Sequence, residues 1–351
     1  MTMKKFAALA VLAAVSASSY AQSSVTLFGI ADATVQFGRG NLENNSGMGS
    51  GGLNSSRIGF RGVEDLGGGL KAGFWLEAGY NLNNGNGNGQ GAQTGLAFKR
   101  RSTVSLMGDS WGEVRLGRDF TAVYNNVYDA FGDNGTGAIL EGIDLVTYGV
   151  QTRTDNAISY FTPKTLGGFN AQLQYYRNGR SLSPTNNADS VGNGYGIRVG
   201  YENGPVNVGV AYGETDFDTG APVVTRVDTK NVNIGGSYDF GVAKLLLTAG
   251  QDKGEVPGDS AKTRYYAVGT TVPVGVGLIR AGWTRVSERD SDARADKFAV
   301  GYVHNLSKRT ALYTTFAYLK NKDGSSLSLN GSSTSAGGNS KGLDIGLRHA
   351  F

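Results

Sequence analysis

Residues 343–351 read Leu-Asp-Ile-Gly-Leu-Arg-His-Ala-Phe, and this stretch is the clearest guide to the fold. Its odd-numbered positions, Leu343 to Phe351, carry the apolar side chains and one histidine, whereas its even-numbered positions carry an acid, a base and two small residues. Successive side chains of a strand point to opposite faces, so this pattern predicts a strand between an apolar and a polar environment. The aromatic ring of Phe351 shares the apolar face of this strand.

The same alternation recurs along most of the chain. It is clear in residues 70–77, 169–175, 206–212 and 231–239, where apolar side chains alternate with Gly, Asn, Gln, Ser and charged residues. A soluble sandwich also alternates in this way, so the period of two alone does not separate a sandwich from a barrel.

The connections between these segments favour a barrel. Short turns, such as 64–68, 108–110 and 203–204, are separated by longer polar segments, such as 83–91 and 325–339. Short turns at one end and long loops at the other are typical of outer-membrane barrels. We therefore predict an all-β, sixteen-stranded antiparallel transmembrane barrel around an aqueous lumen. Its strands are expected to begin near Val25, Asn54, Leu70, Phe98, Gly112, Thr152, Phe169, Gly194, Pro205, Val227, Val242, Lys262, Val276, Arg294, Thr310 and Lys341.

The composition excludes several classes of protein. The 351 residues include no Cys, which excludes a disulfide framework and a thiolate metal site. Gly is abundant, with 55 residues, but aromatic residues make up 10% and are spread throughout, unlike in a disordered chain. The formal charge of +4 is small and the charged residues are scattered, with no long run of one sign, so we expect no nucleic-acid partner. No cofactor is expected either.

The first 21 residues have the pattern of a secretory signal peptide. Lys4 and Lys5 precede an apolar run, and Ser19-Tyr20-Ala21 offers small residues at both key cleavage positions. The apolar run is shorter than the roughly 20 residues that a spanning helix needs. We expect residues 1–21 to be removed on export and residues 22–351 to form the barrel in the outer membrane, in contact with its lipid.

Several motifs are more specific, in order along the chain. They are 22–29 (Gln-Ser-Ser-Val-Thr-Leu-Phe-Gly), 56–62 (Ser-Arg-Ile-Gly-Phe-Arg-Gly), 116–119 (Leu-Gly-Arg-Asp), Arg153 with 156–160 (Asn-Ala-Ile-Ser-Tyr), and the ending 346–351. Together they resemble the trimeric general porins of β-proteobacteria. The resemblance implies a homotrimer whose third loop folds inward and narrows the pore. It also implies passive diffusion of small hydrophilic solutes and inorganic ions, with no catalysis.

The long segment between Arg118 and Thr152 is the candidate for that loop. It is the longest stretch without strand alternation, and loops of such length are usually functional. Its acids are the candidates for the acidic side of the constriction: Asp129, Asp133, Glu141 and Asp144.

The resemblance places a basic cluster on the wall opposite this loop, and its motifs carry Arg57, Arg118 and Arg153 into it. Alternation turns Arg57 inward, opposite Ile58, and it puts Arg153 in phase with Ser159. Arg118 is in phase with the apolar face and needs a bulge or a strand end to turn inward. An arginine on the lipid face would cost about 2–4 kcal/mol at the midplane, which favours the lumen for mid-strand arginines.

The sequence does not decide whether Arg100 or Arg101 lines the pore. The family pattern favours Arg100, and alternation with Val104 favours Arg101.

Three other functions stay as alternatives. A substrate-specific channel would share the fold, and an adhesin or phage receptor would use the long loops. An outer-membrane enzyme needs a nucleophile or base beside a histidine, and neither His304 nor His349 has such a setting in the sequence. Both histidines are expected in interfacial packing rather than at a metal. The sequence does not decide whether the channel prefers anions or cations, because the acids of the loop counteract the charge of the wall arginines.

Overall fold

The computed structural model describes residues 24–87, 95–132, 134–139, 152–177, 192–218, 226–289 and 291–351. The expected signal peptide therefore lies outside the described residues. Nearly all described elements are strands, with one short 3₁₀ helix. No helix within these ranges is long and apolar enough to cross a membrane.

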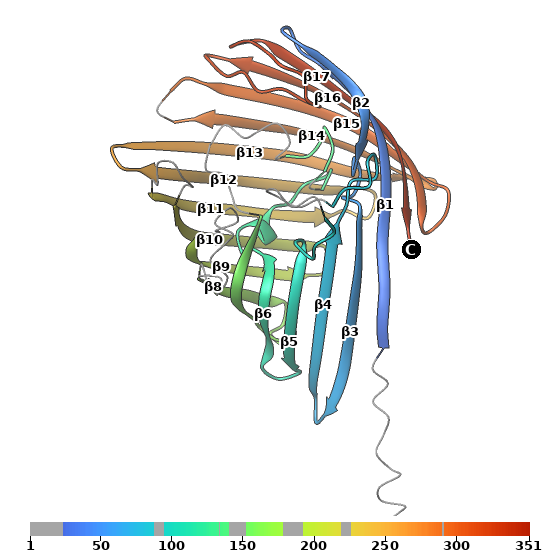
Figure 1. Cartoon of the computed structure of the whole chain (residues 1–351), viewed down its shortest axis with the longest axis vertical. Helices are drawn as coiled ribbons and strands as arrows, with labels where there is room; N and C mark the ends of the chain where they lie inside the picture. The colour runs from blue at the N-terminus through green and yellow to red at the C-terminus, as the bar shows by residue number, and fades with distance from the viewer. Residues whose placement is uncertain are drawn as a thin grey trace, which may run out of the picture.

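The strands join into one antiparallel sheet that closes on itself (Figure 1). Apart from the second and third strands, which both pair with the first, each strand pairs with the next along the chain. The last strand pairs with the first, with Ile30 opposite Ala350 and Arg39 opposite Lys341. Closure satisfies the backbone groups that an open edge would expose to lipid. The elements are β1 (Ser24–Arg39), β2 (Asn44–Ser50), β3 (Arg57–Gly67), β4 (Leu70–Gly79), β5 (Arg101–Gly108), β6 (Gly112–Phe120), η1 (Tyr124–Asn126), β7 (Arg153–Phe161), β8 (Phe169–Tyr176), β9 (Asn193–Asn203), β10 (Val206–Asp218), β11 (Arg226–Asp239), β12 (Lys244–Val256), β13 (Asp259–Val274), β14 (Gly277–Glu288), β15 (Arg294–Asn305), β16 (Thr310–Lys322) and β17 (Asn339–Ala350).

The 17 strands of the sheet occupy sixteen positions in the wall. β2 pairs with residues 33–39 of β1 and β3 pairs with residues 24–30, so the two together form the second wall strand. The prediction of sixteen strands is confirmed. β2 was missed because Asn-Asn-Ser-Gly-Met-Gly-Ser carries no apolar alternation.

The apolar side chains of the wall point outward, and the polar ones point inward. On β11 the outward Ile234 is 59% exposed, whereas its neighbour Asn233 is 1% exposed. The same contrast separates Leu173 from Gln172 on β8. A continuous exposed apolar surface around a buried polar one is the reverse of a soluble protein and suits a lipid-facing wall.

Tight turns lie at one end of the wall and longer connections at the other. The chain turns within residues 68–69, 204–205 and 275–276 at one end, and it spans 80–100, 121–152 and 323–338 at the other. In Figure 1, β3–β6 run roughly vertically while β10–β14 run roughly horizontally, as expected for strands tilted to a barrel axis. Phe351 lies beside β1, where its N–H donates to the carbonyl of Gly29 at 3.1 Å.

The interior is not entirely open to water. An apolar cluster lies inside the wall, where Ala130 and Phe131 of the β6–β7 connection and Leu329 of the β16–β17 connection meet side chains of β13–β16. The sequence had led us to expect a lumen without a packed core. Two long connections instead pack together inside the barrel, so the open part of the lumen must lie to the other side.

Candidate pore constriction

The β6–β7 connection is the expected third loop, and its described part, 121–132 and 134–139, packs against the polar face of the wall. Asn126 of η1 donates through Nδ2 to the carbonyl of Gly209 at 3.0 Å and to Oδ1 of Asn233 at 2.9 Å. The N–H of Tyr128 donates to Oγ1 of Thr248 at 2.9 Å. The loop therefore crosses β10, β11 and β12 on their polar face.

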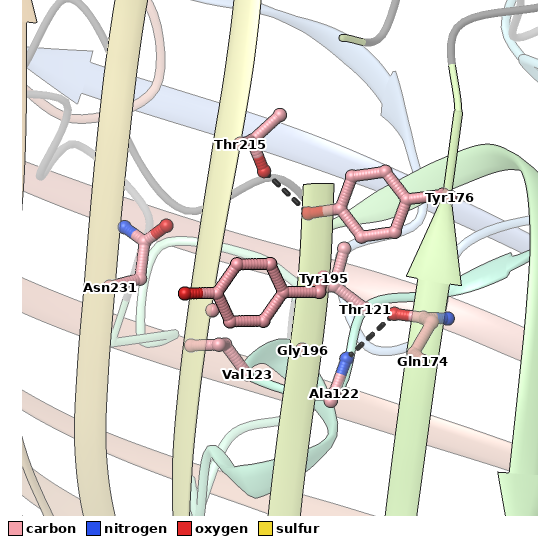
Figure 2. A pocket seen from close by; sticks show the side chains of 10 residues that line it. Thr121, Ala122, Val123, Gln174, Tyr176, Tyr195, Gly196, Thr215 and Asn231 are labelled. Carbon is pink, nitrogen blue, oxygen red and sulfur yellow. Dashed lines mark hydrogen bonds between the residues drawn. The ribbon is translucent and has the colours of Figure 1, made fainter. Parts of the chain in front are cut away.

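The loop begins in a small pocket among β8–β11, shown in Figure 2. The N–H of Ala122 donates to Oε1 of Gln174 at 3.2 Å. Beside it, the hydroxyls of Tyr176 and Thr215 lie 2.5 Å apart. Buried polar groups are costly unless they are paired. The Ala122 bond therefore holds the start of the loop to the wall, and the Tyr176–Thr215 contact joins two wall strands beside it.

The carboxylate of Asp129 joins two parts of the third loop. Its carboxylate accepts hydrogen bonds from the N–H of Phe131 at 2.8 Å and from the N–H of Ile139 at 2.5 Å. Burial raises the pKa of Asp129 to about 6, although these two bonds and the charges of Lys297 and Arg280 act in the opposite direction. Both carboxylate oxygens are thus engaged in closing residues 129–139 into a turn.

Cations of the far wall hold this turn in place. Arg280 of β14 donates to the carbonyl of Phe131 at 3.2 Å and lies 4.8 Å from the centre of its ring. Lys297 of β15 donates to the carbonyl of Ala138. The N–H of Thr136 donates to Oδ2 of Asp344 on β17 at 2.8 Å. The loop is therefore fixed to the wall from β8 to β17.

Glycines on the inner wall make room for the loop. A Cβ at Gly235 would lie 2.5 Å from the Tyr128 ring, and one at Gly342 would lie 1.9 Å from Oγ1 of Thr136. Real Cβ atoms do not approach other atoms so closely, so any larger residue would push the loop inward. Further inner glycines contact the loop in the same way: Gly196, Gly209, Gly213 and Gly269.

The opposite wall, from β3 to β7, carries a cluster of arginines around two buried acids. Glu77 is the first acid: Oε1 lies 2.6 Å from Nε of Arg100 and 3.4 Å from an Nη atom of Arg57. The indole N–H of Trp75 donates to the other oxygen of Glu77 at 3.1 Å.

Asp119 is the second acid. An Nη atom of Arg115 lies 2.6 Å from Oδ2 of Asp119, and Nε of Arg101 lies 3.7 Å from the same oxygen. Arg115 also makes a two-bond contact with Glu113, at 2.8 and 3.0 Å. We call Arg57, Arg100, Arg101 and Arg115 the arginine cluster.

The other two predicted arginines lie at the loop end of β6 and β7. Arg118 donates to the carbonyl of Lys99 and pairs with Asp155, both at 2.5 Å. The ladder shifts register between Gly117 and Asp119, so the bulge that Arg118 requires is present.

The same irregularity changes the phase of β7. Asn156 has a φ of 51°, and Thr154 pairs with Asp119, so alternation does not carry from Ser159 to Arg153. The argument that put Arg153 in phase with Ser159 is therefore wrong. Nε of Arg153 donates to the carbonyl of Arg100 at 2.8 Å, which brings it to the edge of the arginine cluster.

Comparison with known proteins decides the family. The sequence profile described as Gram-negative porin matches residues 8–324. The chain belongs to the Gram-negative porin family. It is 42% identical to outer membrane porin protein 32 of Delftia acidovorans, covering 99% of both chains. It is 30% identical to an outer membrane porin protein of Bordetella pertussis, covering 99% of this chain and 100% of that one.

Solved structures agree. An anion-selective porin from Comamonas acidovorans has a TM-score of 0.82 at 40% identity, covering 94% of this chain and 100% of that chain. OmpT of Vibrio cholerae has a TM-score of 0.67 at 16% identity, covering 94% of this chain and 98% of that one, and it shares the fold. This porin is thus a passive channel of the Gram-negative outer membrane.

The structure of this porin brings some predicted residues together and leaves others aside. Arg57, Arg100 and Arg101 all belong to the arginine cluster, where each contacts an acid. The choice between Arg100 and Arg101 as the pore-lining residue stays a prediction. Of the loop acids, Asp129 is described, while Asp133, Glu141 and Asp144 lie outside the described residues.

The sequence analysis overlooked several residues of the site. Arg115 alternates with Val114 and Leu116, so the period of two already placed it inside. Glu77 belongs to the alternating segment 70–77, where it lies on the polar face. Nothing in the sequence linked it to Arg57 and Arg100. Arg198 of β9 also holds the loop, because its Nε donates to Oδ1 of Asn126 at 3.0 Å. No motif in the sequence marks the three loop-holding cations, Arg198, Arg280 and Lys297.

The histidines of this porin lie on the outer face. His304 contacts the hydroxyl of Tyr302 at 3.3 Å, and His349 contacts that of Thr310 at 2.9 Å. Within the described ranges, no group of three or more His, Cys, Asp or Glu side chains could hold a metal ion.

We predict that Gly342→Val displaces the third loop, because the new side chain would overlap Thr136. Overpacking of this kind costs about 1–3 kcal/mol, so the midpoint of thermal unfolding should fall, and single-channel conductance should change. Gly47→Val on β2 is the matched control, since a Cβ there meets nothing within 4 Å. Equal stability and conductance for the two variants would contradict the seating of the loop on this glycine.

Proposed function

We propose that this porin prefers anions, and that the arginine cluster and the third loop form its constriction. The observation that carries the proposal is that Arg57 and Arg101 are more exposed than the acids that they contact. Asp119 and Glu77 are 5% and 7% exposed, beneath the arginines that contact them. The side chains of Arg57 and Arg101 each keep 20% of their surface open.

Charges near water dominate the potential that a passing ion meets, and low-dielectric walls focus it. The two buried acids hold the guanidinium groups in place and reduce their repulsion. The exposed rims of the cluster then present positive charge to the lumen, as rings of basic side chains do in anion channels. The anion-selective porin of Comamonas acidovorans, at 40% identity, supports the same sign.

The acids of the third loop act mainly within the loop in this proposal. Both carboxylate oxygens of Asp129 accept hydrogen bonds from backbone N–H groups, so Asp129 adds little negative charge to the open side of the lumen. Asp133, Glu141 and Asp144 remain candidates for the acidic side of the constriction. A passive pore of this kind needs no catalytic residues, and we propose that the chain has no enzymatic activity.

We predict that Arg101→Gln lowers the permeability ratio of chloride over potassium. A unit charge at ~4 Å in water is worth about 1 kcal/mol, so the ratio should fall by about twofold to fivefold. The reversal potential of the mature protein in a planar bilayer under a KCl gradient measures this. Asp119 keeps Arg115 as a partner, so the variant should still fold.

The control is Arg264→Gln on the outer face of β13, where the native side chain donates to Gln251. It should leave the reversal potential unchanged. A cation-selective wild-type channel, or equal shifts in both variants, would contradict the proposal.

We further propose that residues 1–21 are removed and that three copies associate through their apolar outer faces. Support comes from the family motifs and from large exposed side chains on β1 and β17, such as Leu27 and Leu347. Native mass spectrometry of protein purified from outer membranes should show three chains, each beginning at Gln22. A single-chain mass would contradict the trimer, and a chain beginning at Met1 would contradict the cleavage.

A further inference from the structure

Three side chains form an unusual stack on the polar face between the arginine cluster and the tight turns. The guanidinium of Arg61 on β3 lies 5.1 Å from the ring centre of Phe28 and 5.0 Å from that of Trp75. The two rings meet edge to face with their centres 5.1 Å apart. We call Phe28, Arg61 and Trp75 the aromatic stack.

The stack faces the lumen. Val25 and Leu27 precede Phe28 on β1 and are exposed on the outer face. Phe28 is in phase with the buried Asp32 and Thr34 instead, which places it inward. Trp75 donates to the inward Glu77, and Arg101 of the arginine cluster lies 4.6 Å from the Trp75 ring centre. Tyr265 and Tyr313 on the other half of the inner face are buried, whereas Phe28 and Trp75 are only partly buried. Contact with water does not stabilise a large aromatic ring, so the partial exposure of these two rings needs an explanation.

Arg61 differs from the arginines of the cluster in its charge balance. Arg57, Arg100, Arg101 and Arg115 each contact a carboxylate, whereas within the described residues Arg61 has no acid within ion-pair distance. Arg61 is also exposed. A guanidinium that stacks on rings keeps its N–H groups free to bind a carboxylate through two parallel hydrogen bonds.

The position suits a second binding step along the path. β3 runs from Arg57 toward the tight turn after Gly67, so Arg61 lies four residues nearer that end. At ~3.3 Å per residue this is about 13 Å along the strand. An anion that leaves the arginine cluster would meet Arg61 next.

We propose that the aromatic stack is a binding station for solutes that carry a carboxylate on an aromatic ring. The carboxylate pairs with Arg61, and the ring of the solute packs against Phe28 and Trp75. This deepens the proposed anion preference and rests on it. A simple anion such as chloride or acetate would use the charge of Arg61 alone, so the rings should favour aromatic over aliphatic carboxylates.

The test is competition with chloride current through the mature protein in a planar bilayer. Benzoate, cyclohexanecarboxylate and acetate are added in turn, and the concentration that halves the current is measured. Benzoate should act at about fivefold lower concentration than acetate, as expected for one added aromatic contact, and cyclohexanecarboxylate should act less strongly than benzoate.

Two variants separate charge from stacking. Phe28→Leu should raise the benzoate concentration toward that of acetate and leave acetate unchanged. Arg61→Gln should weaken both anions. Arg264→Gln on the outer face is the control and should change neither. Heat-modifiable migration on gels verifies that each variant folds. If one of the two variants does not fold, the result of the other tests the proposal.

The outcomes distinguish this inference from the proposed function. Equal action of benzoate and acetate on the wild-type channel overturns the station while leaving anion preference intact. A benzoate advantage that survives both Phe28→Leu and Arg61→Gln also overturns it. An absence of anion-selective current in the wild-type protein overturns the proposed function, and the station with it.

Discussion

The structure depends on one constraint, which is that every backbone N–H and C=O of a wall within lipid must be paired inside the protein. The pairing of β1 with β17 meets this constraint by closing the sheet. Once the sheet is closed, each strand has one face toward lipid and one toward the lumen, and the side chains divide accordingly. Arginines, acids and glycines are then collected on the inner face, where they can act on solutes instead of destabilising the wall.

The inner face is divided into two halves with different tasks. From β8 to β17, glycines and the loop-holding cations Arg198, Arg280 and Lys297 seat the third loop. The apolar cluster around Phe131 and Leu329 fills the same side. From β3 to β7, the arginine cluster remains beside the open path. We therefore propose that the basic side chains serve two purposes: some hold the loop, and those of the arginine cluster face the solutes that pass.

Alternation in the sequence was enough to predict the wall, because the period of two is imposed on nearly every strand by its two environments. It failed where the backbone departs from regular pairing. β2 lacks an apolar face, and the irregularity at Gly117 and Asn156 reverses the phase that was assigned to Arg153. The glycines that make room for the third loop were not predictable either. In the sequence, a glycine that contacts Tyr128 or Thr136 looks like any other strand glycine, and only the folded structure shows that the loop lies against it.

We propose that water and anions pass along the half of the inner face formed by β3–β7, while the third loop covers the other half. The sequence contains no Cys, so a single introduced cysteine is the only thiol in each variant. Its reaction with a membrane-impermeant anionic thiol reagent can be followed during current recording. We predict that Arg61→Cys reacts and that the current falls. Thr315→Cys, beneath Arg280, and Val104→Cys, on the lipid face, should not react. Rapid modification of Thr315→Cys, or protection of Arg61→Cys, would contradict it.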